Sequence, residues 1–237
     1  MNVRERATGR LGENCARFSK PPKATIPRFA FYMRPPAQGS LFASRGEISV
    51  DATFAAATRT RLDPRSWVEV VPSWLSGADS LFERLAAAVP WKEHYRRLFD
   101  RTFLEPRLTA EYGDVREAPE PVAALAAVLS ARYQVPYDSV WLNLYRDGRD
   151  STGWHRDRFS CRQPECVVPV LSLGATRRFL LKPRRGGSSI GFSPRSGDLI
   201  VMGGRCQQEW VHGVPKTPGT PEARISVNFQ SSAQSRR

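Results

Sequence analysis

The chain has 237 residues, of which 41% are hydrophobic and 25% are charged. This length suits one large domain with a tail, and the absence of any run of about 18 apolar residues argues against a membrane-spanning helix. Lys and Arg outnumber Asp and Glu by 36 to 23, which gives a formal net charge of +13 and a pI near 10.3. Such a surface attracts phosphate backbones regardless of their sequence. A basic composition is equally typical of a solvated surface without such a partner.

The first 46 residues are rich in Arg, Lys, Gly and Pro, and their hydrophobic patterning is broken. This composition predicts a flexible N-terminal extension over residues 1–46. An Arg-rich start is also typical of a mitochondrial address, but Glu5, Glu13 and the proline pair at 21–22 argue against one. Met33 remains an alternative start. We expect a cytoplasmic location.

Two helices are predicted in the next part of the chain. After WVEVVPSWL, which indicates a strand followed by a turn from Trp67, the segment 78–91 has apolar residues at helical spacing and stops near Pro90. A second helix is expected over 119–133, with proline near its first turn and small or apolar residues thereafter. Both helices are expected to buttress a sheet.

From Ser139 onward the chain consists of short β-rich segments separated by Gly, Pro and Asp: SVWLNLY, CVVPVLSLG, RRFLLKP, GDLIVMGG, QEWVHGV and ARISVNFQ. This succession favours a double-sheet jelly roll, a fold in which residues far apart in the sequence come together at one open end. The expected fold is α+β, mainly β, with a double-stranded β-helix (jelly roll) core and buttressing helices. Residues 47–136 would form the N-terminal part of the catalytic unit and residues 137–232 the core.

The four cysteines, Cys15, Cys161, Cys166 and Cys206, show no regular spacing, and we find no secretory signal. Reduced thiols in a cytosolic enzyme are therefore expected. Cys161 and Cys166 suggest half of a second metal site, but a C-x4-C pair without a matching second half is a weak indication.

Two of the three histidines stand near a carboxylate or glycine in polar surroundings: His155, in His-x-Asp with Asp157, and His212. Two histidines and one carboxylate on one face of a metal, with the remaining positions open, are typical of non-haem Fe(II) oxygenases. The same ligands also suit zinc. On a strand, His155 and Asp157 would point to the same side.

The surroundings of these residues carry a resemblance. The runs NLYRDGRDSTGWHRD (143–157), LSLGATRRFLL (171–181), SGDLIVMGGRCQQEWVHGVPKT (196–217) and ARISVNFQ (223–230) match a known family in order, spacing and residue identity. They resemble the AlkB family of Fe(II)- and 2-oxoglutarate-dependent dioxygenases, which repair alkylated bases by direct reversal. The resemblance covers roughly residues 105–230.

The resemblance implies that His155, Asp157 and His212 are the catalytic residues and hold Fe(II), with dioxygen as a further substrate. It assigns 2-oxoglutarate binding to Asn143, Tyr145, Arg224, Ser226 and Asn228. Chemistry agrees for Arg224, because a buried carboxylate needs a fixed, always charged fork donor.

The segment EPRLTAEYGDV (105–115) resembles the family's nucleotide-recognition segment. By this resemblance Arg107 would contact a phosphate, and Tyr112 would pack beside a flipped base, because the target nitrogen is shielded in the stack. Tyr112 is equally well explained as an ordinary half-buried strand aromatic. Arg158 is a third candidate for contact with nucleic acid.

The chain departs from the family pattern beside the expected base pocket. Family members often have an acid within two residues after His-x-Asp and a second arginine at the end of the last motif, whereas this chain has Arg158, Phe159 and Gln230. In the family this acid and this arginine can form one ion pair beside the base pocket. Losing both is consistent, because losing only one would leave a buried charge without a partner. The missing carboxylate removes an acceptor for an exocyclic amino group, which indicates an altered base preference. VREAPEP also replaces the usual aromatic-rich lid.

The sequence thus predicts oxidative demethylation of N-alkylated bases in DNA or RNA, coupled to decarboxylation of 2-oxoglutarate to succinate. The expected partner is alkylated nucleic acid, without a membrane, and a monomer is favoured. Two alternatives stay open: a 2-oxoglutarate-dependent hydroxylase of a protein or small molecule, and a catalytically inactive nucleic-acid binder.

Overall fold

The computed structural model describes residues 47–98, 101–157, 161–219 and 222–235. The predicted extension over residues 1–46, and with it Cys15, lies outside the described residues, as do Arg158 and Phe159.

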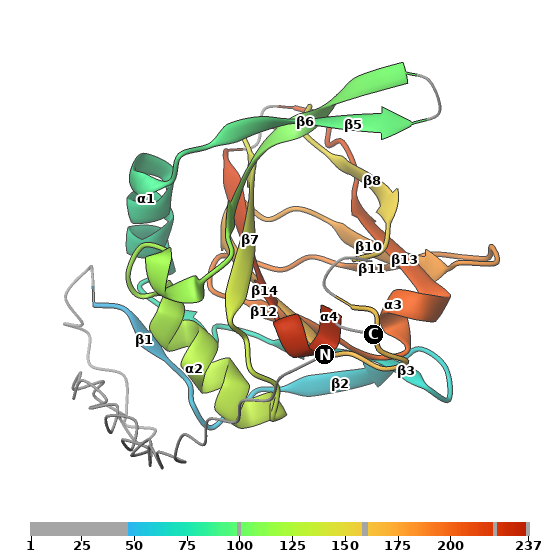
Figure 1. Cartoon of the computed structure of the whole chain (residues 1–237), viewed down its shortest axis with the longest axis horizontal. Helices are drawn as coiled ribbons and strands as arrows, with labels where there is room; N and C mark the ends of the chain where they lie inside the picture. Colours follow the sequence, from blue (N-terminus) through green and yellow to red (C-terminus); the bar gives the residue numbers. More distant parts are fainter. Residues whose placement is uncertain (1–46, 99–100, 158–160, 220–221, 236–237) are drawn as a thin grey trace, which may run out of the picture. The chain divides into compact units, whose positions relative to one another are not determined.

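Two antiparallel sheets form the core of the molecule (Figure 1). The larger sheet has eight strands in the order β2 (Thr58–Arg61), β3 (Ser66–Val71), β12 (Leu199–Gly204), β9 (Val168–Gly174), β14 (Arg224–Gln230), β7 (Ser139–Tyr145), β6 (Arg101–Tyr112) and β5 (Lys92–Leu98). The smaller has four, in the order β11 (Ile190–Phe192), β10 (Phe179–Pro183), β13 (Trp210–Val214) and β8 (Thr152–His155). This arrangement confirms the predicted jelly-roll core.

Several short elements complete the fold. They are the paired strands β1 (Ser49–Val50) and β4 (Leu75–Ser76), the 3-10 turn η1 (Val115–Glu117), and the one-turn helices α3 (Cys206–Glu209) and α4 (Ser232–Ser235). Of these, α3 matters most for the site, because it stands between β12 and β13 and contacts both strands.

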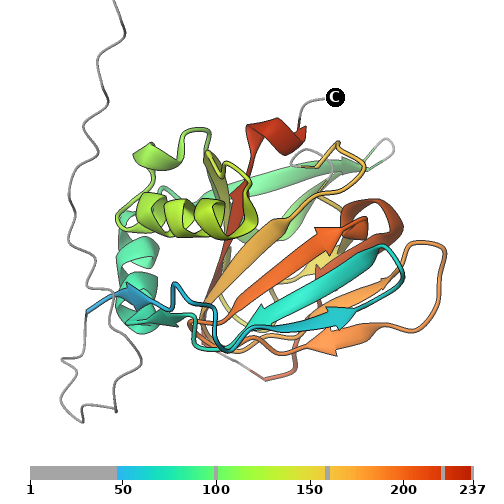
Figure 2. The same cartoon turned by 90° about the horizontal axis from the view of Figure 1, so that it is seen from below.

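Two longer helices, α1 (Ala78–Ala88) and α2 (Val122–Tyr133), cover the outer face of the larger sheet (Figures 1 and 2). Residues four apart on a helix share a face, and the pairs Leu81 and Leu85 on α1 and Leu125 and Leu129 on α2 are fully buried. The buttressing helices are thus confirmed. In the described part of the chain, no helix has the length and apolar character needed to cross a bilayer.

Strand β14 shows how the larger sheet separates packing from chemistry. Successive strand residues point to opposite faces. Ile225, Val227 and Phe229 belong to the apolar cluster under the helices. The alternate residues, beginning with the buried polar side chains of Arg224 and Ser226, therefore point toward the smaller sheet.

The hairpin of β5 and β6 was not predicted from the sequence. Its first strand reads KEHYRRL, in which charged residues obscure any alternation of apolar and polar positions. Such a strand is tolerated because β5 lies at the sheet edge, where charged side chains also discourage pairing with another chain. The hairpin extends the sheet beyond β7 and adds a wall to the space between the two sheets.

The structure corrects the expectation of reduced thiols for two of the cysteines. Cys161 and Cys166 form a disulfide, with their Cα atoms 6.0 Å apart, within the range that a bridge requires. The C-x4-C pair therefore closes on itself and does not form half of a metal site. Cys206 is free and buried, and burial raises the pKa of its thiol to about 12. The cytoplasmic location stays a prediction.

Candidate active site

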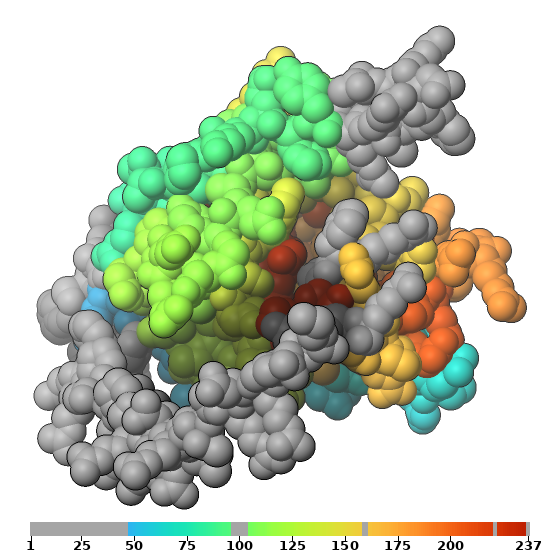
Figure 3. Space-filling model, viewed as in Figure 1, coloured from blue at the N-terminus to red at the C-terminus, as the bar shows by residue number. Residues whose placement is uncertain are grey.

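A cavity of about 560 Å³ lies between the two sheets and is lined by residues of both. In the space-filling view (Figure 3), α1 and α2 form part of the outer surface. Their apolar residues pack with the side of the larger sheet that faces away from the cavity. The lining is polar where the sheet alternation turns side chains inward, on β6, β7 and β14. Most site residues discussed below lie on these strands or on the smaller sheet; Asp157 lies two residues past the end of β8, and Gln207 is on α3.

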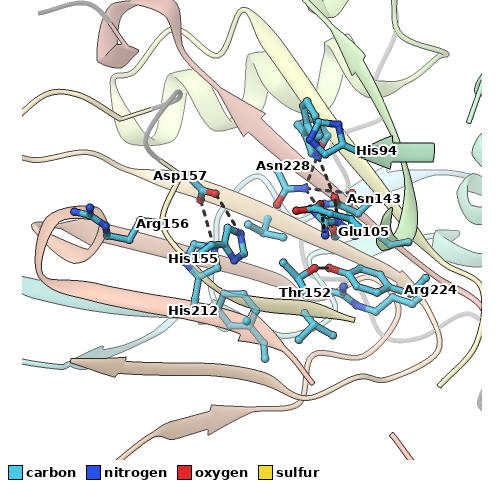
Figure 4. A pocket seen from close by; sticks show the side chains of 18 of the residues that line it. His94, Glu105, Asn143, Thr152, His155, Arg156, Asp157, His212, Arg224 and Asn228 are labelled. Atoms are coloured by element: carbon cyan, nitrogen blue, oxygen red, sulfur yellow. Dashed lines mark hydrogen bonds and ion pairs between the residues drawn. The ribbon is translucent and has the colours of Figure 1, made fainter. Parts of the chain in front are cut away.

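At one side of the cavity, His155, Asp157 and His212 converge (Figure 4). His155 ends β8 and is the direct antiparallel neighbour of His212 on β13. His155 Nε2 lies 3.7 Å from Asp157 Oδ1, and His212 Nε2 lies 3.6 Å from Asp157 Oδ2. One ligand atom from each residue falls within 4.8 Å of the others, and no other such group of His, Cys, Asp or Glu occurs among the described residues. The three side chains can hold one metal ion.

Hydrogen bonds to Gly153 and Gln207 orient two of these ligands, His155 and Asp157. His155 Nδ1 lies 2.9 Å from the carbonyl of Gly153, and donation by Nδ1 leaves the Nε2 lone pair facing the metal position. Gln207 on α3 binds Asp157 twice: its Oε1 accepts the backbone N–H at 2.9 Å, and its Nε2 donates to Oδ2 at 3.1 Å. Sequence reasoning missed Gln207. The signal was an amide residue five positions before His212 in CQQEWVH.

The charges of the site suit metal binding. Burial, with the charge of His212, lowers the pKa of His155 to about 4, so its imidazole is neutral at neutral pH. Burial alone would raise the pKa of Asp157. The charge of His212 and hydrogen bonds from His212 and Gln207 outweigh it and lower that pKa to about 2. A neutral imidazole and an ionised carboxylate are the forms in which these residues bind a metal.

Arg224 provides a buried cation at another part of the same cavity. The residue is 1% exposed, and its Nη2 donates to Ser172 Oγ at 2.9 Å. Its Nε and Nη1 atoms have no hydrogen-bond partner among the described residues. Burial lowers the pKa of this guanidinium. Because an unpaired buried cation is costly, and a guanidinium fork matches a carboxylate, the arrangement fits an anionic ligand.

The remaining polar residues of this wall are bonded to one another. Asn143 Oδ1 accepts from Arg107 Nε at 2.8 Å and from Trp141 Nε1 at 3.0 Å, while its Nδ2 donates to Ser226 Oγ at 3.0 Å. Asn228 Nδ2 donates to the carbonyl of Trp141 at 2.8 Å. This network forms a fixed polar surface along the cavity wall, from the neighbourhood of Arg224 to Trp141.

Tyr145, which also lines the cavity, is held by a 2.7 Å hydrogen bond between its hydroxyl and that of Thr152. The centre of its ring lies 5.3 Å from the Arg224 guanidinium carbon. Tyr145 therefore borders the space that a ligand of Arg224 would occupy.

A comparison with protein families agrees with this geometry. Residues 104–230 match the model of the 2OG-Fe(II) oxygenase superfamily. The chain belongs to this superfamily. The predicted Fe(II) and 2-oxoglutarate are thus confirmed as cofactor and co-substrate, and the residues present fit both: a metal triad of the right ligand types, and an unpaired buried arginine for a dicarboxylate.

Within the superfamily, the chain is AlkB-like. It is 33% identical over 178 residues to alpha-ketoglutarate-dependent dioxygenase alkB homolog 3 of Bos taurus, which covers 66% of this chain and 62% of the relative. The human alkB homolog 3 is 30% identical over 175 residues, 65% of this chain and 61% of the relative. The DNA oxidative demethylase ALKBH2 of Arabidopsis thaliana is 26% identical over 191 residues, 64% and 61% respectively. The chain spans about three fifths of the length of these relatives.

A solved structure, that of OsALKBH1, shares the fold of this oxygenase. It aligns with a TM-score of 0.55 and 15% sequence identity over 73% of this chain and 100% of that chain. At this identity the likeness concerns the fold alone.

Of the three candidate nucleic-acid residues, the structure describes Arg107 and Tyr112. Arg107 is 8% exposed, lines the cavity, and has its Nη1 2.7 Å from Glu105 Oε2, whereas contact with a phosphate backbone requires an accessible side chain. Tyr112 is the strand neighbour of Val140 and packs on the helix-covered face, as expected of a half-buried strand aromatic. It does not line the cavity that holds the triad. Arg158 lies outside the described residues.

Sequence reasoning also missed three residues at the end of the cavity away from Arg224: His94, Glu111 and Trp141. For Trp141 there was a signal, because it stands two positions before Asn143 on β7 and so shares its face. For Glu111 the signal was its place in EPRLTAEYGDV (105–115), directly before Tyr112. For His94 there was none, since the strand that carries it was not predicted.

Proposed function

We propose that this 2OG-Fe(II) oxygenase demethylates N-alkylated bases of DNA or RNA, with 2-oxoglutarate decarboxylated to succinate. One structural observation carries the proposal: the metal triad and the unpaired Arg224 share one cavity that still extends to His94, Glu111 and Trp141. A dicarboxylate on Arg224 and a metal at the triad leave that extension for a substrate. The names of the relatives and the net charge of +13 support nucleic acid as that substrate.

The residues take the following roles in this proposal. His155, Asp157 and His212 hold Fe(II), and Arg224 binds the distal carboxylate of 2-oxoglutarate. When bound, the iron, the co-substrate and dioxygen supply the oxidising power that converts an N-methyl group into N-hydroxymethyl, with succinate and carbon dioxide as co-products. The C–N bond of the N-hydroxymethyl group then breaks: its electrons return to the base nitrogen, the hydroxyl proton is released, and the carbon leaves as formaldehyde.

The chain itself contributes position and exclusion of water. The fork of Arg224 fixes one end of the co-substrate, so that its other end faces the triad. Gln207 holds the carboxylate of Asp157, and Gly153 holds the imidazole of His155. A base can enter the cavity only after it leaves its stack, which favours single-stranded or mispaired substrates.

The two parts of the chain contribute differently to this catalytic unit. We assign the co-substrate and metal to residues 137–232, because the triad and Arg224 lie there. Residues 47–136 add the β5–β6 hairpin and thereby one wall of the substrate end.

The test is release of formaldehyde and succinate from purified protein with Fe(II), 2-oxoglutarate and a single-stranded oligonucleotide that carries 1-methyladenine or 3-methylcytosine. A His155→Ala variant is the control. We expect both products in equal amounts from the wild type and neither from the variant. Succinate without formaldehyde would reject these substrates in favour of a hydroxylase of other molecules. Neither product, together with binding of the oligonucleotide, would indicate an inactive binder.

A further inference from the structure

The substrate end of the cavity is built on three neighbouring strands of the larger sheet. Trp141 on β7 stands directly opposite Glu111 on β6 and directly opposite Asn228 on β14. Directly paired side chains lie on the same face with their Cβ atoms about 5 Å apart. In Figure 4, His94 lies on the far side of Asn143 from Arg224. A carboxylate, an indole and an imidazole thus gather where neither the metal nor the co-substrate needs them.

Trp141 is fixed in place before any ligand binds. Its Nε1 donates to Asn143 Oδ1 at 3.0 Å, and its carbonyl accepts from Asn228 Nδ2 at 2.8 Å. His94 packs against it edge to face, with ring centres 5.7 Å apart and ring planes at 90°. A rigid indole offers a π face, which attracts planar and positively charged groups, at little entropic cost.

Glu111 gives this end a negative charge. Its side chain is exposed, and it makes no hydrogen bond or ion pair with any residue that the structure describes. A second cavity of about 350 Å³ adjoins it, and there the charges of Lys92 and Glu93 offset each other. Arg107 also lines the cavity, but it is paired with Glu105 at 2.7 Å. Glu111 therefore has no ion-pair partner among the described residues, whereas Arg224 makes the opposite end cationic. The cavity is polarised along its length.

This polarity distinguishes between methylated bases. Methylation at N1 of adenine or N3 of cytosine leaves the ring positively charged, with an amino group on the adjacent carbon. N1-methylguanine and N3-methylthymine are neutral: N3-methylthymine has carbonyl groups on both adjacent carbons, and N1-methylguanine has a carbonyl group at C6 and an amino group at C2. A carboxylate carries a negative charge and only accepts hydrogen bonds. It therefore attracts the cationic rings and their amino groups, whereas the neutral bases offer it no charge and present the carbonyl groups at C6 of N1-methylguanine and C4 of N3-methylthymine, which repel it.

We infer that Glu111, Trp141 and His94 form a subsite that selects cationic, amino-bearing N-methylated bases. The inference rests on the proposed function and assigns its specificity. It also explains how the chain does without an acid directly after His-x-Asp: β6 supplies a carboxylate from another direction. Glu111 accepts from the amino group, and Trp141 provides the stacking face.

The decisive variant is Glu111→Gln, which keeps the shape of the side chain and removes its charge. Its matched control is Glu83→Gln, an identical change at an exposed position on α1, across the sheet from the cavity. The substrates are four single-stranded oligonucleotides of one sequence, which carry 1-methyladenine, 3-methylcytosine, 1-methylguanine or 3-methylthymine. The measured quantity is kcat/KM for formaldehyde release.

For the wild type we expect the two cationic bases to be preferred. In Glu111→Gln their kcat/KM falls about 10- to 100-fold, the usual effect of losing a charge-assisted hydrogen bond, while values for the neutral bases change little. Glu83→Gln leaves all four values unchanged. Equal losses for all four bases, or none for the cationic pair, would overturn the inference.

A binding measurement separates recognition from turnover. Without dioxygen, the anisotropy of a labelled oligonucleotide carrying 1-methyladenine gives a Kd, which we expect to rise in Glu111→Gln and in Trp141→Leu but to stay near the wild-type value in Trp141→Phe. If the wild type releases no formaldehyde from any oligonucleotide, the proposed function fails instead. Release from a trimethyl-lysine peptide alone would assign the subsite to a protein cation and overturn both.

Discussion

The two faces of the larger sheet use the same strands for opposite purposes. On the outer face, Ile225, Val227 and Phe229 pack under α1 and α2 in one apolar cluster. On the inner face, Arg224 and Ser226 are buried just as deeply, but as polar groups around a cavity. The comparison teaches that burial alone does not identify a core. At Arg224, a buried cation whose hydrogen bonds are incomplete lines a cavity, and this combination indicates the place of a ligand.

The largest expected effect is on the inner face. Asp157→Ala removes the carboxylate that lies between the two histidines, so we expect Fe(II) binding to be lost and succinate formation to fall by at least about 1000-fold. The melting temperature of the metal-free protein should change little. Anaerobic titration with Co(II), followed by its visible spectrum, checks the metal site without requiring activity. Undiminished Co(II) binding would show that the triad is not the metal site.

The outer face should respond in the opposite way. Leu142→Ala leaves a cavity beneath the helices and is expected to lower the free energy of unfolding by about 2–5 kcal/mol. Urea denaturation measures this change. The KM for 2-oxoglutarate of the remaining folded protein should match that of the wild type. A raised KM would show that the two faces are not independent.

Arg224→Met tests the unpaired cation itself. We expect the KM for 2-oxoglutarate to rise about 100-fold, because the carboxylate loses its charged partner. Without co-substrate the variant should be as stable as the wild type or more stable, since it no longer buries an uncompensated charge. Thermal melts with and without 2-oxoglutarate measure both effects. Clear destabilisation of the ligand-free variant would mean that Arg224 has a structural role.

The smallest effect concerns the orientation of a ligand. Gln207→Leu removes both hydrogen bonds to Asp157, and we expect metal affinity to fall about 10-fold. Gln208→Leu is the matched control, because Gln208 bonds to Gln163 and Cys161 instead. Anaerobic titration with Co(II) compares the three proteins. Equal affinities would show that β8 and β13 alone position the triad.

Local pattern predicted much of the fold. Residues 139–145 were expected as a strand and form β7 with those limits. The two buttressing helices were also predicted, although α1 ends at Ala88 and α2 begins at Val122, inside the expected limits. These segments could be predicted because each buries one apolar face with a regular period. The β5–β6 hairpin could not be predicted, since its strand partners and its edge position stabilise it, rather than its own composition.

The amino-acid sequence by itself determined the chemistry: the residue types of His155, Asp157 and His212 indicated a metal site, and the family resemblance of the surrounding motifs implied iron and 2-oxoglutarate, with Arg224 as a binding residue. Family membership confirmed these two groups. Only the tertiary structure decided which other residues join them. Strand register placed Glu111 opposite Trp141, and α3 brought Gln207 to Asp157, from positions 50 residues apart. The reason is physical. A periodic pattern reports which face a side chain occupies, whereas the neighbours of that face are set by strand pairing between distant segments.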